Sequence, residues 1–570
     1  MDSSTDKANM DNELILVIWC DTNGTDEKVH SKMTFLCVAH PTAATAMGLF
    51  NCLQEALLSI EIQGITASEC TKLVGVGTDG ASANVAAGGL KGLVEEELPW
   101  VYWMWCLAHR LELAVHDALK DTAFSLIDDM LLRLYYLYEK SPKKCRELDD
   151  IIQDLHEFIQ FDSSGVRPVR SSGSRWISHK LSAMKRVLSK FGAYTNHLAT
   201  LSQDSSVRPC DRAKLKGYYN KWIDAKYLLG CALFIDLLTP CAILSKAMQK
   251  DEIDILGELS GLLKTVKEVN KLKTKCLSSW PTYSGTLKKI EEKDDETTYQ
   301  LQSLKNYRGA KNFYSRNHQA YCVSINDCLK SRLDWSDLDL IRDIIFVLET
   351  QGWQKVLDEE ENHSIEKPDP TEAVDRIAMK FEKPLEAAGV EICELRQEFR
   401  DMLEHSVQFI SLSTLGYQEV WWRLFHSPCA EQWSNILTLA ELLFSLPASN
   451  GKLERCFSTL KLIKADRRCS LSNDTLDDLL ILNTDRVPLQ DFNPGAAIDL
   501  WWKSKTRRLN QPPRKQYAKH QDAAKNSREI ETDHESEDEA GESVLLNDWD
   551  EWLNTSDDDL SDPPSSSSDH

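Results

Sequence analysis

The chain has 570 residues, of which 42% are hydrophobic and 27% are charged. This composition excludes a chain that is disordered over most of its length, and the length predicts several folded domains. The net charge is −23, but the residues after Arg528 include sixteen Asp or Glu and no Lys or Arg, so the first 528 residues carry only −7. This mildly negative net charge excludes a surface that is basic all over. A local basic groove would not be visible in the net charge.

The first 118 residues alternate between strand and helix patterns. The predicted elements are strands at 13–20 and 30–39, a helix at 42–60, strands at 72–76 and 100–105, and a helix from 106. This order predicts an α/β fold.

Residues 119–428 have a different periodicity, in which apolar residues recur at i, i+3, i+4 and i+7. The pattern is clearest at 127–137, 227–248 and 255–272, and strand patterns almost vanish. We therefore predict a large all-helical insertion here, followed by further amphipathic helices over 429–500.

The last two segments differ in charge. A basic linker is predicted at 501–528, where residues 501–520 contain seven Lys or Arg and no acid. Such a cluster is compatible with a nuclear import signal or a phosphate-binding patch, and equally with a solvated linker. Residues 529–570 predict an acidic, disordered tail, in which VLLNDWDEWL places apolar residues among acids as amphipathic activation segments do.

The 16 cysteines are scattered without a CxxC pair, which is typical of reduced intracellular thiols. No run of about 18 apolar residues occurs, and the N-terminus is polar and acidic, so we expect neither a membrane segment nor a signal peptide. The expected location is nuclear, or otherwise cytosolic.

Two acidic residues lie in suggestive contexts. Asp79 follows the strand predicted at 72–76, and the carboxyl end of a strand is a common place for ligand-binding groups in α/β sheets. Taken alone, an Asp in the sequence TDGASAN is more often a turn former or a helix N-cap. Glu454, taken alone, is typical of an intrahelical surface pair with Arg455.

Five spaced motifs together resemble the hAT superfamily of transposases. They are DSSTD from Asp2, TDGASAN around Asp79, Cys106-Leu107-Ala108-His109, Arg175-Trp176, and Glu454-Arg455-Cys456-Phe457-Ser458. The resemblance implies an α/β RNase H-like core interrupted by the all-α insertion, with Asp2, Asp79 and Glu454 as a catalytic triad. In an active enzyme these acids would hold Mg²⁺, since such sites need carboxylates that converge on two divalent ions.

The resemblance also implies DNA contacts by Arg175, Trp176, Cys106 and His109. An exposed Trp stacks on an unpaired base while an Arg meets phosphate, and the polar sequence before Arg175 favours exposure. Most of the 16 Trp residues are nevertheless expected in the core. Cys106 and His109 could form half of a zinc site, but no second pair lies at zinc-finger spacing, so we expect no structural zinc. His109 can equally be a satisfied core residue.

The stretch 433–482 most resembles the hAT dimerisation region and implies a homodimer. Its apolar residues exceed what one isolated helical pair buries, so some are expected to pack on the sheet and the rest on a second subunit. The alternative is that all of them belong to the internal core. The residues expected at the subunit interface are Leu439, Leu442, Leu443, Phe457, Leu460, Leu479 and Leu480.

The resemblance fails at the beginning of the chain. In the family the first acid ends a buried strand, whereas only Met1 precedes Asp2, so we expect the first strand to be missing from the 1–118 part of the core. The zinc-binding module that commonly precedes the core is also not evident, which fits a truncated gene model or a core retained by its host. We therefore expect a transposase-derived nuclear protein that dimerises and binds DNA or chromatin partners without transposing, and an active Mg²⁺-dependent transposase or nuclease is the alternative.

Overall fold

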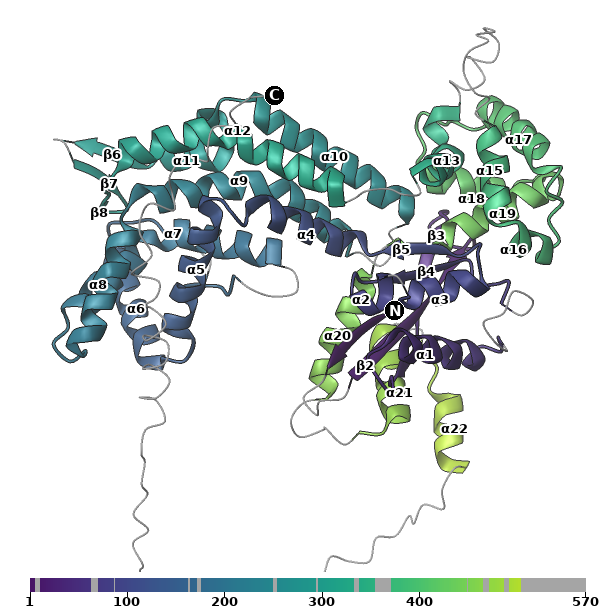
Figure 1. Cartoon of the computed structure of the whole chain (residues 1–570), viewed down its shortest axis with the longest axis horizontal. Coiled ribbons are helices and arrows are strands. Elements are labelled where there is room, and N and C mark those ends of the chain that lie inside the picture. The colour runs from purple at the N-terminus through teal and green to yellow at the C-terminus, as the bar shows by residue number, and fades with distance from the viewer. Residues whose placement is uncertain are drawn as a thin grey trace, which may run out of the picture.

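The computed structural model describes residues 1–5, 11–62, 70–86, 88–161, 165–171, 176–249, 254–293, 296–332, 338–353, 371–448, 450–464, 471–485 and 492–503. Arg175, most of the basic segment 501–528 and the whole acidic segment 529–570 lie outside these ranges. Within these ranges the chain is mostly helical and has small sheets. The helices form a larger group, α4–α12, and a smaller group, α13–α19, which lie on different sides of the α/β part that holds β1–β5 (Figure 1).

Three antiparallel strands begin the chain. β2 (Asp11–Asp21) lies between β1 (Asp2–Thr5) and β3 (His30–Ala39), which agrees with the strands predicted at 13–20 and 30–39. Residues 2–5 also form a short strand, which pairs with Asp11–Leu14. This strand begins at Asp2, so it is not the strand that was expected to precede Asp2. The edge of β2 supplies N–H and C=O groups that an adjacent extended segment can pair with, even one of four residues.

A parallel pair of strands follows. β4 (Gly75–Thr78) pairs with β5 (Tyr102–Trp105), and α2 (Ser82–Val85) and α3 (Leu90–Glu97) lie between them in the sequence. β4 begins later than predicted because Thr71 and Lys72 form a turn. The amino group of Met1 donates a hydrogen bond of 2.8 Å to the carbonyl of Gly77, so the start of β1 lies against β4.

Helices cover both faces of the antiparallel strands. Ile15 packs with one apolar cluster that includes residues of α1 (Ala46–Ser59) and α3, whereas its neighbour Leu14 packs with another. The second cluster contains residues of α20 (Gly451–Ile463) and α21 (Asn473–Thr484). Neighbouring side chains of a strand point to opposite faces, so this alternation follows from the strand itself. The C-terminal helices thus complete the α/β part.

α21 also covers the edge of β3. Asp477 accepts a hydrogen bond of 2.8 Å from the backbone N–H of Val38, and Asp485 accepts one of the same length from Phe35. These carboxylates satisfy backbone donors at a strand edge that would otherwise be available to another chain.

The larger helical group contains one small sheet. β6 (Ile290–Lys293), β7 (Glu296–Tyr299) and β8 (Gln302–Ser303) form an antiparallel sheet at a place where only helices were predicted. The sequence pattern there is polar and the strands are short, which explains why periodicity did not predict them. The helices of the group are α4 (Leu107–Leu119), α5 (Ala123–Glu139), α6 (Pro142–Leu155), α7 (Trp176–Gln203), α8 (Pro209–Trp222), α9 (Ala225–Ala247), α10 (Ile255–Thr274), α11 (Pro281–Lys288) and α12 (Tyr307–Arg332).

The smaller helical group follows, so the predicted insertion forms two groups rather than one. It lies beside β4 and β5 in Figure 1, and it continues through α19 into the α/β part. Its helices are α13 (Leu338–Leu348), α15 (Glu372–Lys380), α16 (Glu382–Ala387), α17 (Leu395–Phe409), α18 (Tyr417–Phe425) and α19 (Ser434–Phe444), and α22 (Gly495–Lys503) ends the described chain.

α9 is the one helix of the described residues that is long and apolar enough to cross a membrane by length and composition. The protein interior buries 78% of its apolar window, and α7, α10 and α12 pack around it. Such burial is what the core helix of a globular bundle shows.

Candidate functional site

The glycines of β4 allow another segment to approach the strand closely. A Cβ atom at Gly75 would lie 2.5 Å from Cδ of Pro447, and one at Gly77 would lie 3.1 Å from Cβ of the same proline. Pro447 belongs to the connection between α19 and α20. Since no larger residue fits there without movement, the Gly-Val-Gly sequence of β4 lets the start of α20 lie on the strand.

Asp79 lies in the turn directly after β4. Its Oδ1 accepts hydrogen bonds from the backbone N–H of Ala81 at 3.0 Å and from Nδ2 of Asn84 at 2.7 Å. These contacts orient the half-buried carboxylate as in an Asx turn. Among the described residues Oδ2 has no hydrogen-bond partner, so one carboxylate oxygen is available to a ligand.

The other two acidic positions approach the same end of β4 through their backbones. Asp2 directly follows Met1, which contacts Gly77, although the side chain of Asp2 lies outside the described residues. The backbone N–H of Glu454 donates to the carbonyl of Asn450 at 3.1 Å, and Asn450 lies against Gly77. β1, β4 and α20 therefore meet around Gly77.

The acidic residues near the carboxyl end of β4, which we call the acidic edge, have the right chemistry for magnesium. The described residues do not form a complete magnesium site. Carboxylate oxygens are the hard ligands that Mg²⁺ prefers, and Asp79 and Glu454 both supply them. Among the residues whose side chains are described, no group of three His, Cys, Asp or Glu is gathered as a metal site. Asp2 is not among those side chains, so the three-acid arrangement stays a prediction.

Cys106 and His109 have different environments. Cys106 is buried at the end of β5, and its backbone N–H donates to the carbonyl of Thr78 at 2.9 Å, which fixes the start of α4 beside Asp79. His109, one turn further along α4, is exposed. The pair is thus split between the core and the surface, and the reading of His109 as a core residue is wrong.

Trp105 is a further residue of this edge that the sequence patterns did not single out. A Cβ atom at Gly80 would lie 2.4 Å from the indole ring of Trp105, and the guanidinium of Arg110 lies 5.2 Å from the ring centroid. The only sequence signal is the glycine after Asp79, since nothing local indicates that a ring from β5 covers it.

Trp176 is half-buried rather than exposed. Its ring meets that of His116 edge-on at a centroid distance of 6.0 Å, and Nζ of Lys180 lies 5.2 Å from the ring centroid. Both partners belong to the protein, so the indole is held where α7 begins against α4. Arg175 lies outside the described residues, and the DNA-contacting role of the pair stays a prediction.

Most of the residues expected at the subunit interface are inside the chain. Leu439, Leu443, Phe457, Leu460 and Leu480 are buried, whereas Leu442 and Leu479 are half-buried. The five buried residues are therefore not available to a second subunit, and their assignment to a subunit interface is wrong. The same helices expose other apolar side chains instead, namely Leu462, Ile481 and Leu482, and α22 exposes Ile498, Leu500 and Trp501.

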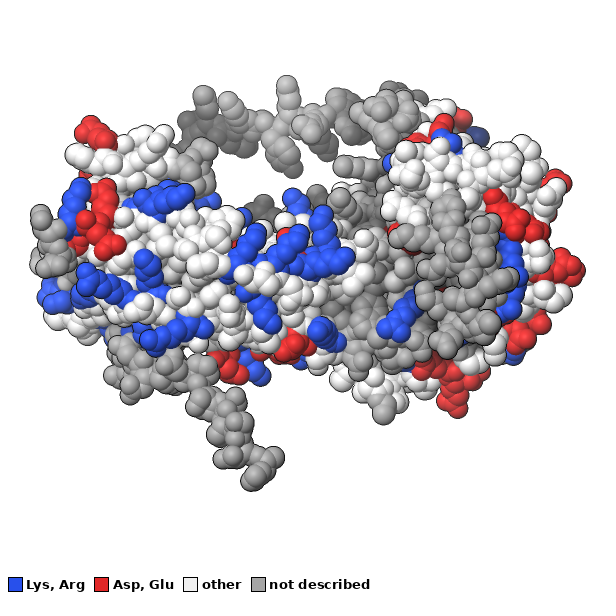
Figure 2. All heavy atoms as spheres, turned by 90° about the horizontal axis from the view of Figure 1, so that it is seen from above, with Lys and Arg blue, Asp and Glu red and all other residues white. Residues whose placement is uncertain are grey.

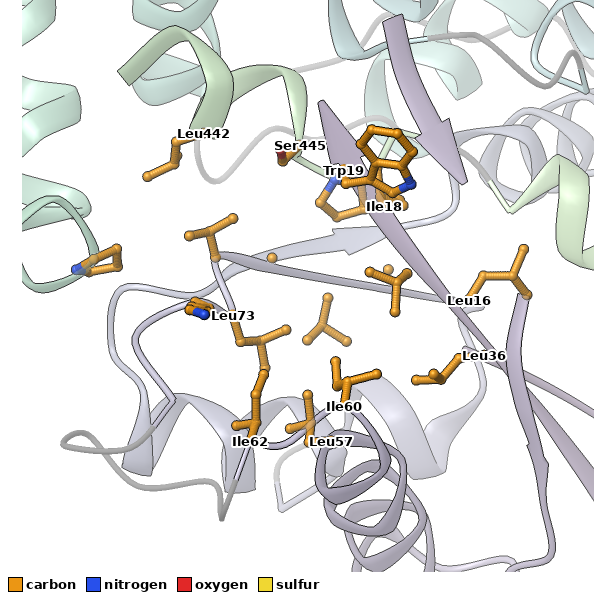
Figure 3. Close-up of a pocket in the computed structure, with 18 of the residues that line it drawn as sticks. Leu16, Ile18, Trp19, Leu36, Leu57, Ile60, Ile62, Leu73, Leu442 and Ser445 are labelled. Carbon is orange, nitrogen blue, oxygen red and sulfur yellow. The ribbon is translucent and has the colours of Figure 1, made fainter. Parts of the chain in front are cut away.

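A cavity of about 590 Å³ lies next to the acidic edge (Figure 3). Apolar side chains of β2, α1 and α19 point into it, among them Leu16, Leu57 and Leu442. Glu441 is an acidic residue of its wall, and burial raises the pKa of that carboxyl. Apolar walls supply few groups for chemistry, so the candidate site is the polar edge beside the cavity rather than the cavity itself.

Lys and Arg residues gather on one side of the larger helical group. Residues 255–289 and 307–332 contain twelve Lys or Arg and three Asp or Glu, in a chain whose net charge is −23. Figure 2 shows Lys and Arg side chains along the middle of this surface. We define the basic face as the exposed members of this set, which are Lys264, Lys267, Lys271, Lys273, Lys275, Lys288, Lys289, Arg308, Lys311, Arg316 and Lys330.

Four lysines form a stripe along α10 and its C-terminal end. Lys264, Lys267, Lys271 and Lys275 are spaced at i, i+3, i+7 and i+11, which places them on one side of a helix. Nζ of Lys271 lies 2.7 Å from Oε1 of Glu268, an exposed pair of small energetic value. No ion pair joins the other ten residues of the basic face to an acidic side chain among the described residues.

A comparison with known protein families found no family model that matches the chain.

Proposed function

We propose that this chain is a transposase-derived nuclear protein of the hAT type, which binds DNA through the basic face, forms a homodimer and does not transpose DNA. The observation that carries the DNA-binding part is the concentration of exposed Lys and Arg on α10–α12 in an otherwise acidic chain. Fixed positive charges along one surface match the phosphate backbone, whose neutralisation releases counterions.

An ordinary solvated helix surface is the competing explanation for this charge. Lys271 and Lys273 lie in the last turn of α10, where cations interact favourably with the helix dipole. Lys288 and Lys330 likewise lie in the last turns of α11 and α12. The effect fades within one turn, so it accounts for four of the eleven exposed residues. The remaining charges on α10 and α12 favour a polyanionic partner.

The strand arrangement supports the RNase H-like part of the proposal. The antiparallel unit β3–β2–β1 contacts β4 through Met1, and β4 pairs in parallel with β5. Helices cover both faces of the antiparallel unit, and α20, which carries Glu454, begins against β4. In a core of the hAT type, the segments that carry the first, second and last acids should lie next to one another, as β1, β4 and α20 do here.

Binding of a DNA duplex, followed by fluorescence anisotropy at several salt concentrations, tests the proposal. The double variant Lys264→Glu/Lys271→Glu should bind at least about tenfold more weakly, and its log–log salt dependence should be shallower by about one unit for each phosphate that the variant no longer neutralises. The matched control is Lys140→Glu/Lys143→Glu, which changes two exposed lysines outside the basic face by the same charge. Equal binding by the two variants would exclude the basic face as the DNA-binding surface.

The alternative function is Mg²⁺-dependent cleavage or joining of DNA. It is favoured by Oδ2 of Asp79, which has no hydrogen-bond partner among the described residues. In that case Asp79 and Glu454 would hold the ion, which would supply charge stabilisation and an activated water or hydroxyl. We expect no nicking or strand transfer on hairpin-forming DNA with Mg²⁺. Activity that is abolished by Asp79→Ala or by Glu454→Ala would refute the non-catalytic proposal.

A further inference from the structure

Apart from Lys271, the residues of the basic face form no ion pair with an acidic side chain in the described part of the chain. On α10 and α12 the acidic residues whose side chains are described are Glu268 and Asp327, and they cannot balance the eight exposed cations of these two helices. Like charges at this density repel one another, so the free protein gains stability when an anionic segment lies over them.

The chain itself contains such a segment. Residues 529–570 include sixteen Asp or Glu and no Lys or Arg. We propose that residues 529–570 bind the basic face in the absence of nucleic acid and that nucleic acid must displace them. The competition with nucleic acid rests on the proposed function, whereas the binding of 529–570 to α10 and α12 does not.

The basic segment before the tail is the competing partner for these acids. Residues 504–528 contain eight Lys or Arg and one Asp, so they can neutralise fewer than half of the sixteen acids. Even after complete pairing with residues 504–528, residues 529–570 keep a surplus of negative charge. The basic face is positive and lies on folded helices, so its charges need no further ordering to meet that surplus.

A long connection joins the acidic segment to the described part of the chain. The described residues end at Lys503, and 25 residues separate that point from the start of the acidic segment. An extended chain spans at most about 3.3–3.6 Å per residue, or roughly 80–90 Å for this connection. Covalent attachment also gives the acidic segment a high effective concentration at the surface.

Carbodiimide crosslinking of the full chain, followed by mass spectrometry, tests the contact directly, because the reagent joins carboxylates to lysine amines that touch. We expect crosslinks from residues 529–570 to Lys264, Lys267, Lys271 or Lys275, and we expect 0.5 M NaCl to reduce them at least about threefold because screening weakens exposed charge pairs. Lys140 and Lys143 are exposed lysines outside the basic face and serve as the internal control. Crosslinks confined to lysines of 504–528, or equally frequent at Lys140 and Lys143, would overturn the proposal.

A second measurement separates this inference from the proposed function. We compare the chain ending at Arg528 with a full-length chain in which the sixteen acids are replaced by Asn or Gln. Both should bind a DNA duplex about tenfold more tightly than the wild type at low salt, since no acidic segment competes for the basic face. Crosslinks to α10 without any DNA binding would leave the tail contact standing and would refute the DNA-binding function. Tail removal that leaves DNA affinity unchanged would refute the competition.

Discussion

At the scale of single residues, close contacts fix the acidic edge of the α/β part. Gly80 follows Asp79 and leaves room for the indole of Trp105, which comes from the neighbouring strand. A side chain at residue 80 would force either the ring or the turn to move, and both possibilities disturb the position of Asp79.

Gly80→Ala should therefore destabilise the protein. The new Cβ atom would lie 2.4 Å from the Trp105 ring, and overpacking of this kind costs about 1–3 kcal/mol. Chemical denaturation measures the change in the free energy of unfolding. Gly92→Ala in α3 is the control, because no atom lies within 4 Å of its new Cβ and alanine favours a helix interior. Equal stability of the two variants would contradict the packing argument.

His197 links stability to pH. Its Nδ1 lies 2.9 Å from the hydroxyl of Tyr138 and its Nε2 lies 3.3 Å from Oε2 of Glu147. Burial lowers the pKa of His197, and this effect exceeds the opposite effect of Glu147. The folded protein therefore takes up a proton at a lower pH than the unfolded chain, in which histidine titrates near 6.5.

The contribution of His197 to stability should be fully present above about pH 6.5 and should be lost as the pH falls toward the folded-state pKa. Unfolding free energies at pH 7.5, 6.5 and 5.5 should fall less steeply for His197→Gln than for the wild type. His109→Gln, which changes an exposed histidine of α4, should keep the wild-type slope. An identical slope in all three proteins would show that burial of His197 does not control this pH dependence.

At the scale of elements, Glu112 joins three helices of the larger helical group. It is buried in α4, its Oε2 accepts from the backbone N–H of Ile177 at 3.0 Å, and its Oε1 accepts from the hydroxyl of Ser245 at 3.1 Å. One carboxylate thus satisfies the start of α7 and a buried group of α9. The helical pattern of α4 predicts this face but not the identity of its partners.

Glu112→Leu should destabilise the helical group by about 2–4 kcal/mol, because two buried donors lose their acceptor. Glu112→Gln keeps one acceptor oxygen and should lose less. Unfolding by urea, followed by circular dichroism, measures both variants. If leucine were tolerated as well as glutamine, the hydrogen bonds of Glu112 would not be what holds α7 and α9 to α4.

At the scale of the whole molecule, the apolar side chains that remain exposed in the folded chain are the candidates for a dimer contact. Leu462, Leu482 and Leu500 are 80%, 63% and 69% exposed, and they lie on the C-terminal helices α20, α21 and α22. A large exposed apolar patch often marks an interface. We propose that the homodimer contact involves these exposed residues, since the buried leucines of α19 and α20 are not available to a second subunit.

Light scattering at micromolar concentration should give twice the chain mass of 64.8 kDa. Leu482→Asp/Leu500→Asp should give the monomer mass with an unchanged circular dichroism spectrum, since both side chains are exposed. Phe158→Asp changes a residue that is 72% exposed in another part of the chain and should leave the dimer intact. A monomeric wild type would refute the proposed dimer.

The amino-acid sequence determined the order of most strands and helices, although not β1 or β6–β8, the mainly helical character of the middle region and the strong separation of charge along the chain. These features depend on local periodicity and composition, which the chain carries whatever its partners are. The same local patterns placed Asp79 after a strand and Glu454 in a helix, although they did not bring the two together.

Only the tertiary structure decided which apolar faces are covered. Leu460 and Leu462 both lie in the amphipathic helix α20, yet the sheet buries the first and leaves the second at 80% exposure. The pairing of β1, the packing of Pro447 on the glycines of β4 and the half-burial of Trp176 likewise join residues far apart in the sequence. Periodicity predicts that a face is apolar, but long-range packing determines what lies against it.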